Sequence, residues 1–267
     1  MSGKQIRLGR ICKADRRTVI VPIDQSITTG PIAGLERIDE TIRSIVAGQP
    51  DAIVMHRGPV LSGLWKDISP TGLIIHLSAG TQLTDQPQVK ALVGSVKEAV
   101  KLGADGISVH ISLGLGTERD RAVLADLGNI SDECVEWGMP LLAMMYVYGS
   151  QPEKIAENII HAARIGGELG ADLIKVNYPG SLKALERLIT TSFVPIVIAG
   201  GAITEDGRET LKLAEEVIAA GAAGVCIGRN VFQHKYPANM ARALTAIVHH
   251  GVTAKEAYEE FIGANVY

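Results

Sequence analysis

The sequence predicts an α/β fold in which eight parallel strands close a (β/α)8 TIM barrel, in a single domain that covers residues 1–267. Three observations predict it. The chain has 267 residues, and barrels of this kind typically fill about 250. Short apolar runs rich in β-branched residues alternate with amphipathic stretches. The composition is 46% hydrophobic but only 4% aromatic, which is typical of a parallel sheet buried on both faces.

Eight apolar runs are the predicted strands. Successive runs begin about 20 to 35 residues apart, which leaves room for a strand, a loop and a crossover helix but not for a second domain. The predicted strands are Thr18–Asp24, Ala52–His56, Leu73–Leu77, Gly106–Ile111, Pro140–Tyr146, Leu173–Asn177, Pro195–Ala199 and Gly224–Gly228.

Glycines mark the ends of three predicted helices. Gly103, Gly170 and Gly221 each stand between an amphipathic stretch and the next strand, where glycine supplies the left-handed conformation that ends a helix. The amphipathic stretches have helical spacing, as in Ile155 and Ile159. A doubly wound open sheet is the structural alternative, but it normally carries a glycine fingerprint after its first strand, and this sequence has none there.

Charge and cysteine content argue against several classes of partner. The net charge is −3 and the pI about 6.2, with no basic run of the kind that binds nucleic acid or an anionic membrane. The three cysteines are too scattered for a disulfide framework or a CxxC metal site, which indicates a reducing compartment. The sequence shows neither an apolar signal core nor a run of about 18 apolar residues, so we expect a cytoplasmic protein.

Two long connections follow the second and third predicted strands. Arg57–Pro70 and Ser78–Gln88 are rich in Gly, Pro, Ser and Thr. Both lie at the carboxyl ends of strands, where barrels of this kind build their active sites, so each is a candidate lid. An ordinary surface loop is the alternative for each.

The sixth predicted strand carries a lysine. Alternation places Leu173, Lys175 and Asn177 on one face and Ile174 and Val176 on the other. The apolar pair should face the helices, so Lys175 should point into the barrel. Burial should lower its pKa from an ordinary value of about 10.4, and a neutral amine can attack a ketone carbonyl. The structural alternative is a lysine that pairs with a barrel carboxylate.

Two further groups stand at strand ends. Alternation along the fifth predicted strand puts Tyr146 on the same face as Met144, at the carboxyl end, where its phenol could exchange a proton with a substrate hydroxyl. On the first strand, Asp24 shares a face with Pro22 and could orient the lysine, take a proton or bind a substrate hydroxyl. The alternatives are a tyrosine that completes the core and a carboxylate that caps its loop.

A phosphate site is predicted after the last two strands. Gly200 and Gly201 follow the seventh strand, and Gly228 and Arg229 follow the eighth. Barrels commonly bind phosphate at these two positions through backbone amides. Glycine lets the backbone approach the oxygens, and Arg229 can add a bidentate contact.

Three histidines raise a metal alternative. His56, His76 and His110 fall at or near the ends of the second, third and fourth strands and could together hold a divalent ion. No HxH or HExxH spacing occurs, and a metal enzyme would leave Lys175 without a role. We therefore predict no metal and no cofactor, and expect His56 to contact a substrate.

Taken together, these motifs resemble the archaeal-type class I aldolases. The resemblance spans nearly the whole chain, in family order. Members include fructose-1,6-bisphosphate aldolase, 2-amino-3,7-dideoxy-D-threo-hept-6-ulosonate synthase and the autoinducer-2 processing thiolase. The matching segments are Val21–Asp24 with Gly30-Pro31, Gly72–Ser78, Ala143–Tyr146, Lys175, Gly200-Gly201 and Gly228–His234.

The resemblance implies a set of functional residues. It makes Lys175 the Schiff-base lysine, Tyr146 the proton donor, and Asp24 the proton acceptor or Schiff-base helper. It also implies a homo-oligomer, often a decamer in this family, and a phosphorylated sugar as the small-molecule partner. Contacts to sugar or phosphate are implied for Gln25, Ser26, Ile27, Thr28, Val147, Tyr148, Val176, Asn177, Gly200, Gly201, Gly228 and Arg229.

The chain departs from the family pattern at two places. The family usually has Asp-His-Gly after the first strand, whereas this chain has Gln25 and Ser26 after Asp24. The family also commonly has an arginine where Tyr148 stands. Both departures concern groups that would meet the substrate, and neither removes the lysine.

The predicted function is therefore that of a Schiff-base aldolase or transaldolase acting on a ketose phosphate. Gly72–Ser78 and Met139–Tyr146 look closest to the aminodeoxyheptulosonate synthases, which join a deoxyketohexose phosphate to aspartate semialdehyde on a route to aromatic precursors. Fructose-bisphosphate aldolase is the near alternative. An acyl transferase of the autoinducer-processing kind is the alternative from another class, and a barrel that only binds a phosphorylated ligand is the last.

Overall fold

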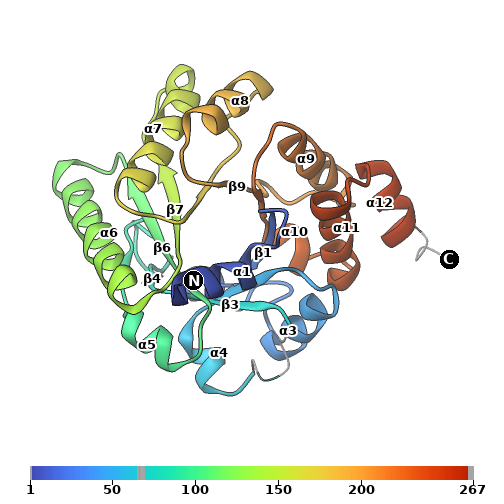
Figure 1. Cartoon of the computed structure of the whole chain (residues 1–267), viewed down its shortest axis with the longest axis horizontal. Helices are drawn as coiled ribbons and strands as arrows, with labels where there is room; N and C mark the ends of the chain where they lie inside the picture. The colour runs from blue at the N-terminus through green and yellow to red at the C-terminus, as the bar shows by residue number, and fades with distance from the viewer. Residues whose placement is uncertain (1, 65, 67–69, 264–267) are drawn as a thin grey trace.

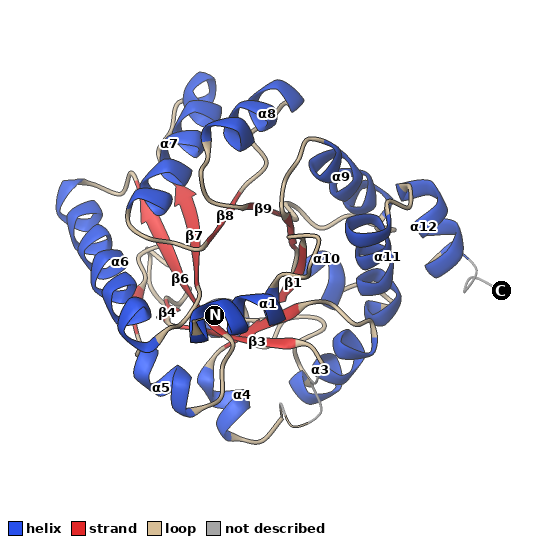
Figure 2. Ribbon diagram, in the orientation of Figure 1, coloured by secondary structure: helices blue, strands red, loops and turns tan. Residues whose placement is uncertain are grey.

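Eight parallel strands close a barrel, as predicted. The computed structural model describes residues 2–64, 66 and 70–263 (Figure 1). Neighbouring strands pair in the order β1-β10-β9-β8-β7-β6-β3-β2, and helices surround them (Figure 2). The strands are β1 (Thr18–Pro22), β2 (Ala52–Met55), β3 (Gly72–His76), β6 (Gly106–Leu113), β7 (Leu141–Val147), β8 (Leu173–Val176), β9 (Ile196–Ala199) and β10 (Gly224–Cys226).

Strand lengths differ from the prediction mainly at the carboxyl ends. β6 runs two residues past Ile111, because its pairing with β7 continues to Leu113 and Val147. β10 ends at Cys226, two residues before Gly228. The chain there leaves the sheet early because Gly228 enters a short helical turn that lies against the first strand.

The barrel has an inner and an outer apolar layer. The inner layer includes Ile20, Val54, Leu142, Met144 and Leu173, while Ile174 and Val176 belong to the outer layer beneath the helices. Side chains alternate between these layers along each strand, because the strand repeat is two residues. The predicted inward direction of Lys175 is thereby confirmed.

Amphipathic helices cover the outside of the barrel. Each turns its apolar side to the strands or, for α12 (Ala254–Phe261), to the neighbouring helices, and its charged side outward, which is what their helical spacing predicts. α8 begins at Ser181, whose hydroxyl accepts a hydrogen bond from the Ala184 amide. The covering helices are α3 (Ile38–Ala47), α5 (Val96–Lys101), α6 (Thr117–Trp137), α7 (Ile155–Glu168), α8 (Leu182–Thr191), α9 (Arg208–Ala219), α11 (Pro237–His250) and α12 (Ala254–Phe261).

An unpredicted helix covers the amino-terminal end of the barrel. α1 (Gly3–Ile11) lies across the opening nearest the viewer in Figure 1. Ile11 is 2% exposed and joins the inner apolar layer, and its carbonyl accepts a hydrogen bond from the Thr18 hydroxyl at 2.7 Å. The helix therefore closes this end of the barrel with an apolar side chain.

Three aspartates at the same end tie neighbouring strands together. Asp51, Asp105 and Asp172 each directly precede a strand. Their carboxylates accept hydrogen bonds from backbone amides at the start of the paired strand that precedes theirs: Val19 for Asp51 at 2.6 Å, Leu73 for Asp105 at 3.1 Å and Leu141 for Asp172 at 2.8 Å. The glycine junctions had indicated only helix ends.

Each of these carboxylates also has a cationic partner. Arg10 pairs with Asp105 and Lys4 with Asp172, both at 2.8 Å, so α1 supplies two of the cations. Asp51 contacts Lys13 at 3.4 Å and His249 at 2.7 Å. Hydrogen bonds to a charged group contribute more than neutral ones, so these contacts hold the amino-terminal helix to the sheet.

The two long connections fold locally. The first contains α4 (Arg57–Leu61), while Trp65 and residues 67–69 lie outside the described residues. The second forms a small antiparallel hairpin between β4 (Ser78–Ala79) and β5 (Ala91–Leu92). Whether either acts as a lid stays a prediction. No helix in the described ranges is long and apolar enough to cross a membrane.

Candidate active site

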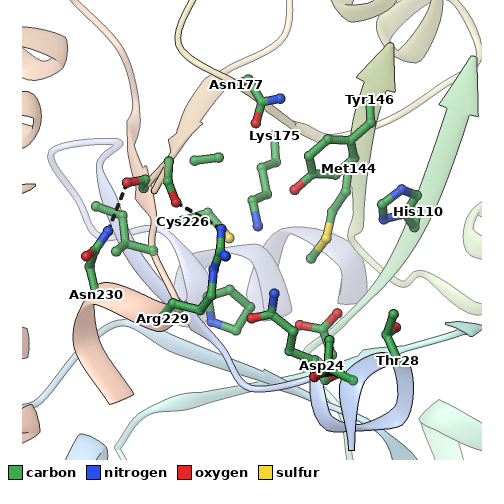
Figure 3. Close-up of a pocket in the computed structure, with 18 of the residues that line it drawn as sticks. Asp24, Thr28, His110, Met144, Tyr146, Lys175, Asn177, Cys226, Arg229 and Asn230 are labelled. Carbon is green, nitrogen blue, oxygen red and sulfur yellow. Dashed lines mark hydrogen bonds between the residues drawn. The ribbon is translucent and has the colours of Figure 1, made fainter. Parts of the chain in front are cut away.

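A cavity of about 550 Å³ opens at the carboxyl ends of the strands. This is the end where barrels of this class carry their active sites. Lys175 points into it between Tyr146 and Cys226, and Arg229 and Asp24 face it from other sides (Figure 3). Its lining is mostly polar: Pro22, Asp24, Gln25, Thr28, Thr29, Gln82, Lys90, His110, Met144, Tyr146, Lys175, Asn177, Ala199, Gly200, Gly201, Cys226, Ile227, Gly228, Arg229 and Asn230.

Lys175 is a buried amine on the inner face of β8. It is 6% exposed and pairs in register with Met144 of β7 and Val197 of β9. Burial acts to lower its pKa, but Cys226, Tyr146 and Asp24 outweigh that effect and raise the pKa above the ordinary value. The predicted lowering of the lysine pKa is therefore wrong. The physical reason is that Cys226, Tyr146 and the Asp24 carboxylate, which lie on or just after three other strands, all act on the ammonium in the same site.

Asp24 is the counterion of the site. Burial acts to raise its pKa, but His76, Lys175 and His56 lower it overall, so Asp24 is a carboxylate at neutral pH. Its Oδ2 lies 3.7 Å from Nε2 of His76. Burial lowers the pKa of His76 to about 4, and Nδ1 of the same ring is 2.7 Å from the Ser108 hydroxyl. His76 is therefore neutral, and Asp24 is the negative charge that faces the Lys175 ammonium across the cavity.

A histidine stacks on the tyrosine. The rings of His110 and Tyr146 are nearly parallel, 11° apart in orientation with centroids 4.4 Å apart. Burial lowers the pKa of His110 to about 3, so the ring is neutral. Its Nε2 is buried and has no hydrogen-bond partner in the described part of the chain. The stacked ring holds the phenol at the rim of β7, which orients its hydroxyl toward the cavity.

The glycine wall is held by Asn230, which stands in the predicted turn after the eighth strand but was given no role of its own. Asn230 is 5% exposed; its amide donates to the carbonyls of Gly200 at 3.0 Å and Ala202 at 2.8 Å, and its oxygen accepts from the Thr204 amide at 2.8 Å. These contacts fix the turn after β9. An asparagine directly after Arg229 was the only signal in the sequence.

Two of the glycines permit close packing. A Cβ at Gly200 would meet the Ile227 side chain at 2.6 Å, and one at Gly228 would meet the Pro22 carbonyl at 2.5 Å. Arg229 donates from its guanidinium to the Gly201 carbonyl at 3.0 Å, which holds it over the turn. The two turns and the guanidinium form one wall with the polarity that an anionic group requires.

Ten predicted site residues come together in this cavity. Six others do not. Ser26, Ile27 and His56 line an adjacent cavity of about 460 Å³ instead. Val176 packs in the outer apolar layer, and Val147 and Tyr148 are absent from the lining of either cavity. The ten that line it are Asp24, Gln25, Thr28, Tyr146, Lys175, Asn177, Gly200, Gly201, Gly228 and Arg229.

Val176 and His56 were misplaced for different reasons. Alternation turns Val176 away from the barrel axis, so its inclusion among substrate contacts is corrected here. His56 meets His76 edge to face, with centroids 5.3 Å apart, and interacts with Asp24 electrostatically and through the Asp24 backbone, from outside the main cavity. Within the described ranges, no three His, Cys, Asp or Glu side chains are grouped to hold a metal ion.

The cavity also contains a second lysine that was not predicted. Lys90 lies just before β5, and its Nζ donates to the Thr28 hydroxyl at 3.0 Å. Burial lowers its pKa. A lone lysine in a polar loop carries no sequence signal, because only the hairpin brings it to the cavity.

A buried lysine on an inner strand face, with a carboxylate, a phenol and an anion-binding wall around it, defines a barrel aldolase that works through a Schiff base. Residues 18–234 match the model of the DeoC/LacD family aldolases, and the chain belongs to this family. It is a Schiff-base aldolase in the manner of its relatives.

Two curated synthases and one solved aldolase structure are similar to this chain over most of its length. The chain is 43% identical to 2-amino-3,7-dideoxy-D-threo-hept-6-ulosonate synthase 1 of Archaeoglobus fulgidus, covering 97% of this chain and 96% of that protein. It is 38% identical to 2-amino-4,5-dihydroxy-6-oxo-7-(phosphonooxy)heptanoate synthase of Streptomyces griseus, over 94% of this chain and 92% of that protein. The chain also superposes on an archaeal fructose-1,6-bisphosphate aldolase whose catalytic lysine is covalently bound to the carbinolamine intermediate of the substrate. The TM-score is 0.82, and the two are 29% identical over 92% of this chain and 99% of that one.

Proposed function

We propose that this enzyme is an aminodeoxyheptulosonate-type synthase, which takes an enamine from a ketose phosphate and joins it to an amino acid semialdehyde. The observation that carries the proposal is Lys175, buried on the floor of a cavity that has an anion-binding wall of Gly200, Gly201, Gly228 and Arg229. The relatives named above as synthases are the more similar in sequence, at 38% and 43% identity.

In the proposed mechanism, the Lys175 ammonium first loses a proton to water in the cavity, because only a neutral amine can attack, and Asp24 stays ionised beside it. Nζ then bonds to the ketone carbon of the donor to give a carbinolamine. Loss of water from the carbinolamine leaves an iminium. The substrate phosphate lies against Gly201 and Arg229, which places the ketone carbon at the lysine.

The iminium draws electrons from the adjacent carbon–carbon bond. As that bond breaks, the proton of the substrate hydroxyl passes to the oxygen of Tyr146 while the phenol proton passes to water, an aldehyde leaves, and an enamine remains. The enamine carbon then bonds to the acceptor aldehyde, whose oxygen takes a proton from Tyr146, and Tyr146 regains a proton from water. Water adds to the new iminium, and its hydrolysis releases the product and restores the amine.

Fructose-bisphosphate aldolase is the second candidate, because the superposed archaeal enzyme shares the fold and has its lysine bound to substrate. Both activities need the same imine, so the donor and acceptor decide between them. The proposal also takes residues 1–267 as one domain of a cytoplasmic homo-oligomer. Sedimentation of the purified protein measures the oligomeric state.

The test is borohydride reduction of the protein with fructose 1,6-bisphosphate, dihydroxyacetone phosphate or a deoxyketohexose phosphate, followed by intact mass measurement. We expect an adduct with the deoxyketohexose phosphate or its fragment, absent from Lys175→Ala and retained in Lys97→Ala, an exposed lysine on α5. An acyl transferase of the autoinducer-processing kind would use the lysine without an aldol step, so it would not join the trapped donor to an acceptor aldehyde. The absence of an adduct with all three donors would overturn the proposal.

A further inference from the structure

Lys90 is a cation in the active-site cavity that the proposed reaction steps do not use. Of its three N–H donors, one goes to the Thr28 hydroxyl at 3.0 Å. Within residues 2–64, 66 and 70–263, no carboxylate lies within 4.0 Å of its Nζ, although Asp24 acts on it at longer range. The ammonium therefore faces the cavity with donors to spare.

The segment around Lys90 holds this side chain in place. A Cβ at Gly80 would meet Cδ of Lys90 at 2.8 Å and the Pro87 carbonyl at 2.6 Å, so a glycine is what lets the lysine stem lie against the hairpin. The Gln82 amide donates to the Thr28 carbonyl at 2.9 Å, which joins the hairpin loop to α2 (Ser26–Thr29). The lysine is part of a packed wall and not a free surface side chain.

The hairpin is also tied to the strand that carries His110. The Ser112 hydroxyl of β6 donates to the Gln88 carbonyl at 2.7 Å, and the His110 amide donates to the Ser78 hydroxyl at 3.0 Å. Nε2 of His110 is the buried nitrogen without a partner noted above, and it lines the same cavity. A polar group of a bound molecule would satisfy this nitrogen, which makes it an independent sign of a ligand at this wall.

The two cationic walls stand on opposite sides of the Schiff-base lysine. In Figure 3, Arg229 and Asn230 lie on one side of Lys175, and Thr28 and His110 lie on the other. A donor phosphate held at Arg229 leaves the wall of Thr28 and Lys90 for the second substrate. A cavity of about 550 Å³ is large enough for both.

We propose that Lys90, together with Thr28, binds the anionic group of the acceptor aldehyde and makes the enzyme selective for acceptors that carry a carboxylate or a phosphate. This inference rests on the proposed function, since it presumes an acceptor that meets the enamine. A lysine ammonium is a compact charge that can bind either anion, so the two sources are separated by experiment.

The experiment compares Lys90→Met, which keeps the aliphatic stem and removes the charge, with Lys90→Arg, which keeps a charge. Lys97→Met is the matched control on the exposed surface of α5. Steady-state rates are measured at saturating donor with three acceptors: aspartate semialdehyde for a carboxylate, glyceraldehyde 3-phosphate for a phosphate, and uncharged glyceraldehyde. Borohydride trapping of the donor imine is measured on every variant.

We expect Lys90→Met to trap the donor as the wild type does, which shows that its fold and lysine chemistry are intact. Its KM for a charged acceptor should rise about ten- to hundredfold, the loss typical of one hydrogen bond between charged groups. Its KM for glyceraldehyde should change less than about twofold, and Lys90→Arg should recover most of the affinity. The charged acceptor with the larger rise identifies the anion.

Three results would overturn the inference. One is an unchanged KM for both charged acceptors in Lys90→Met. Another is an equal rise for charged and uncharged acceptors, which would make Lys90 a structural residue. The third is loss of donor trapping in Lys90→Met alone, which would place Lys90 at the donor. If the wild type itself traps no donor, the proposed function has failed and the acceptor site falls with it.

Discussion

The charged groups at the two ends of the barrel differ in how many of their hydrogen bonds and ion pairs are made within the protein. At the amino-terminal end, Asp51, Asp105 and Asp172 each accept a hydrogen bond from a backbone amide and contact a cation. At the carboxyl end, Lys175 and Asp24 share one site with neutral histidines. The first set is saturated with partners, whereas the second retains unused donors and acceptors.

This difference separates stability from function within one fold. A carboxylate whose hydrogen bonds are all made stabilises the folded state and has no capacity left for a ligand. A buried group with unmade bonds costs stability and can make those bonds to a substrate instead. Variants at the carboxyl end should therefore change activity more than stability, and variants at the amino-terminal end the reverse.

The largest expected effect is on activity at the carboxyl end. Lys175→Met should lower kcat/KM by at least about a thousandfold, because no other amine can form the imine. Its free energy of unfolding should fall by about 1 to 2 kcal/mol, less than for the amino-terminal variants, because methionine keeps the apolar stem while Asp24 loses the ammonium but keeps His76 at 3.7 Å. Enzyme assays and urea unfolding measure the two quantities, and a large loss of stability would contradict the comparison.

The next effect is on stability at the amino-terminal end. Asp51→Ala should lower the free energy of unfolding by about 3 kcal/mol, because it leaves the Val19 amide and His249 without their shared carboxylate. Donor trapping should remain at the wild-type level. Asp15→Ala, which removes the more exposed partner of His249, should cost less than about 1 kcal/mol in the same urea titration.

The buried histidines at the carboxyl end should make the free energy of unfolding fall in acid. Burial lowers the pKa of His76 to about 4 and of His110 to about 3, below the unfolded value of about 6.5. The unfolded chain therefore binds these protons first as the pH falls, so stability should decline from about pH 6.5 toward pH 4. Urea unfolding of His110→Gln should show a smaller decline than the wild type over that range.

His249 should act in the other direction. Both of its ring nitrogens lie 2.7 Å from carboxylates, of Asp15 and Asp51, and these outweigh burial and raise its pKa. Its contribution should be complete below the unfolded pKa of about 6.5 and be lost as the pH rises through the raised folded pKa. His249→Gln should flatten the fall in stability from pH 6 to 8; an unchanged slope would exclude this role.

The smallest expected effect is a shift in pH dependence. Asp24 helps to raise the pKa of Lys175, so Asp24→Asn should lower that pKa and move the midpoint of imine formation to lower pH by about one unit. Borohydride trapping at a series of pH values measures the midpoint, with Asp15→Asn as a control at the opposite end. An upward shift would mean that Asp24 does not stabilise the ammonium.

Several features of this enzyme could be derived from the sequence alone. The number and spacing of the eight apolar runs predicted the barrel. Alternation along the sixth run predicted that Lys175 points inward, because side chains along one strand repeat every two residues. The glycine turns after the last two strands predicted one wall of the cavity, because consecutive strands of a parallel barrel are neighbours and their carboxyl ends meet at the same end.

Only the tertiary structure decided which groups meet across the barrel. Lys90 and Asn230 reach the cavity through a hairpin and a short turn whose paths depend on packing, and the pKa of Lys175 depends on Asp24, which lies more than a hundred residues away in sequence. The hydrogen-bond and ion-pair partners of Asp51, Asp105 and Asp172 could not be predicted from the sequence either. Charges interact through space, and a pattern along one chain cannot specify their separations.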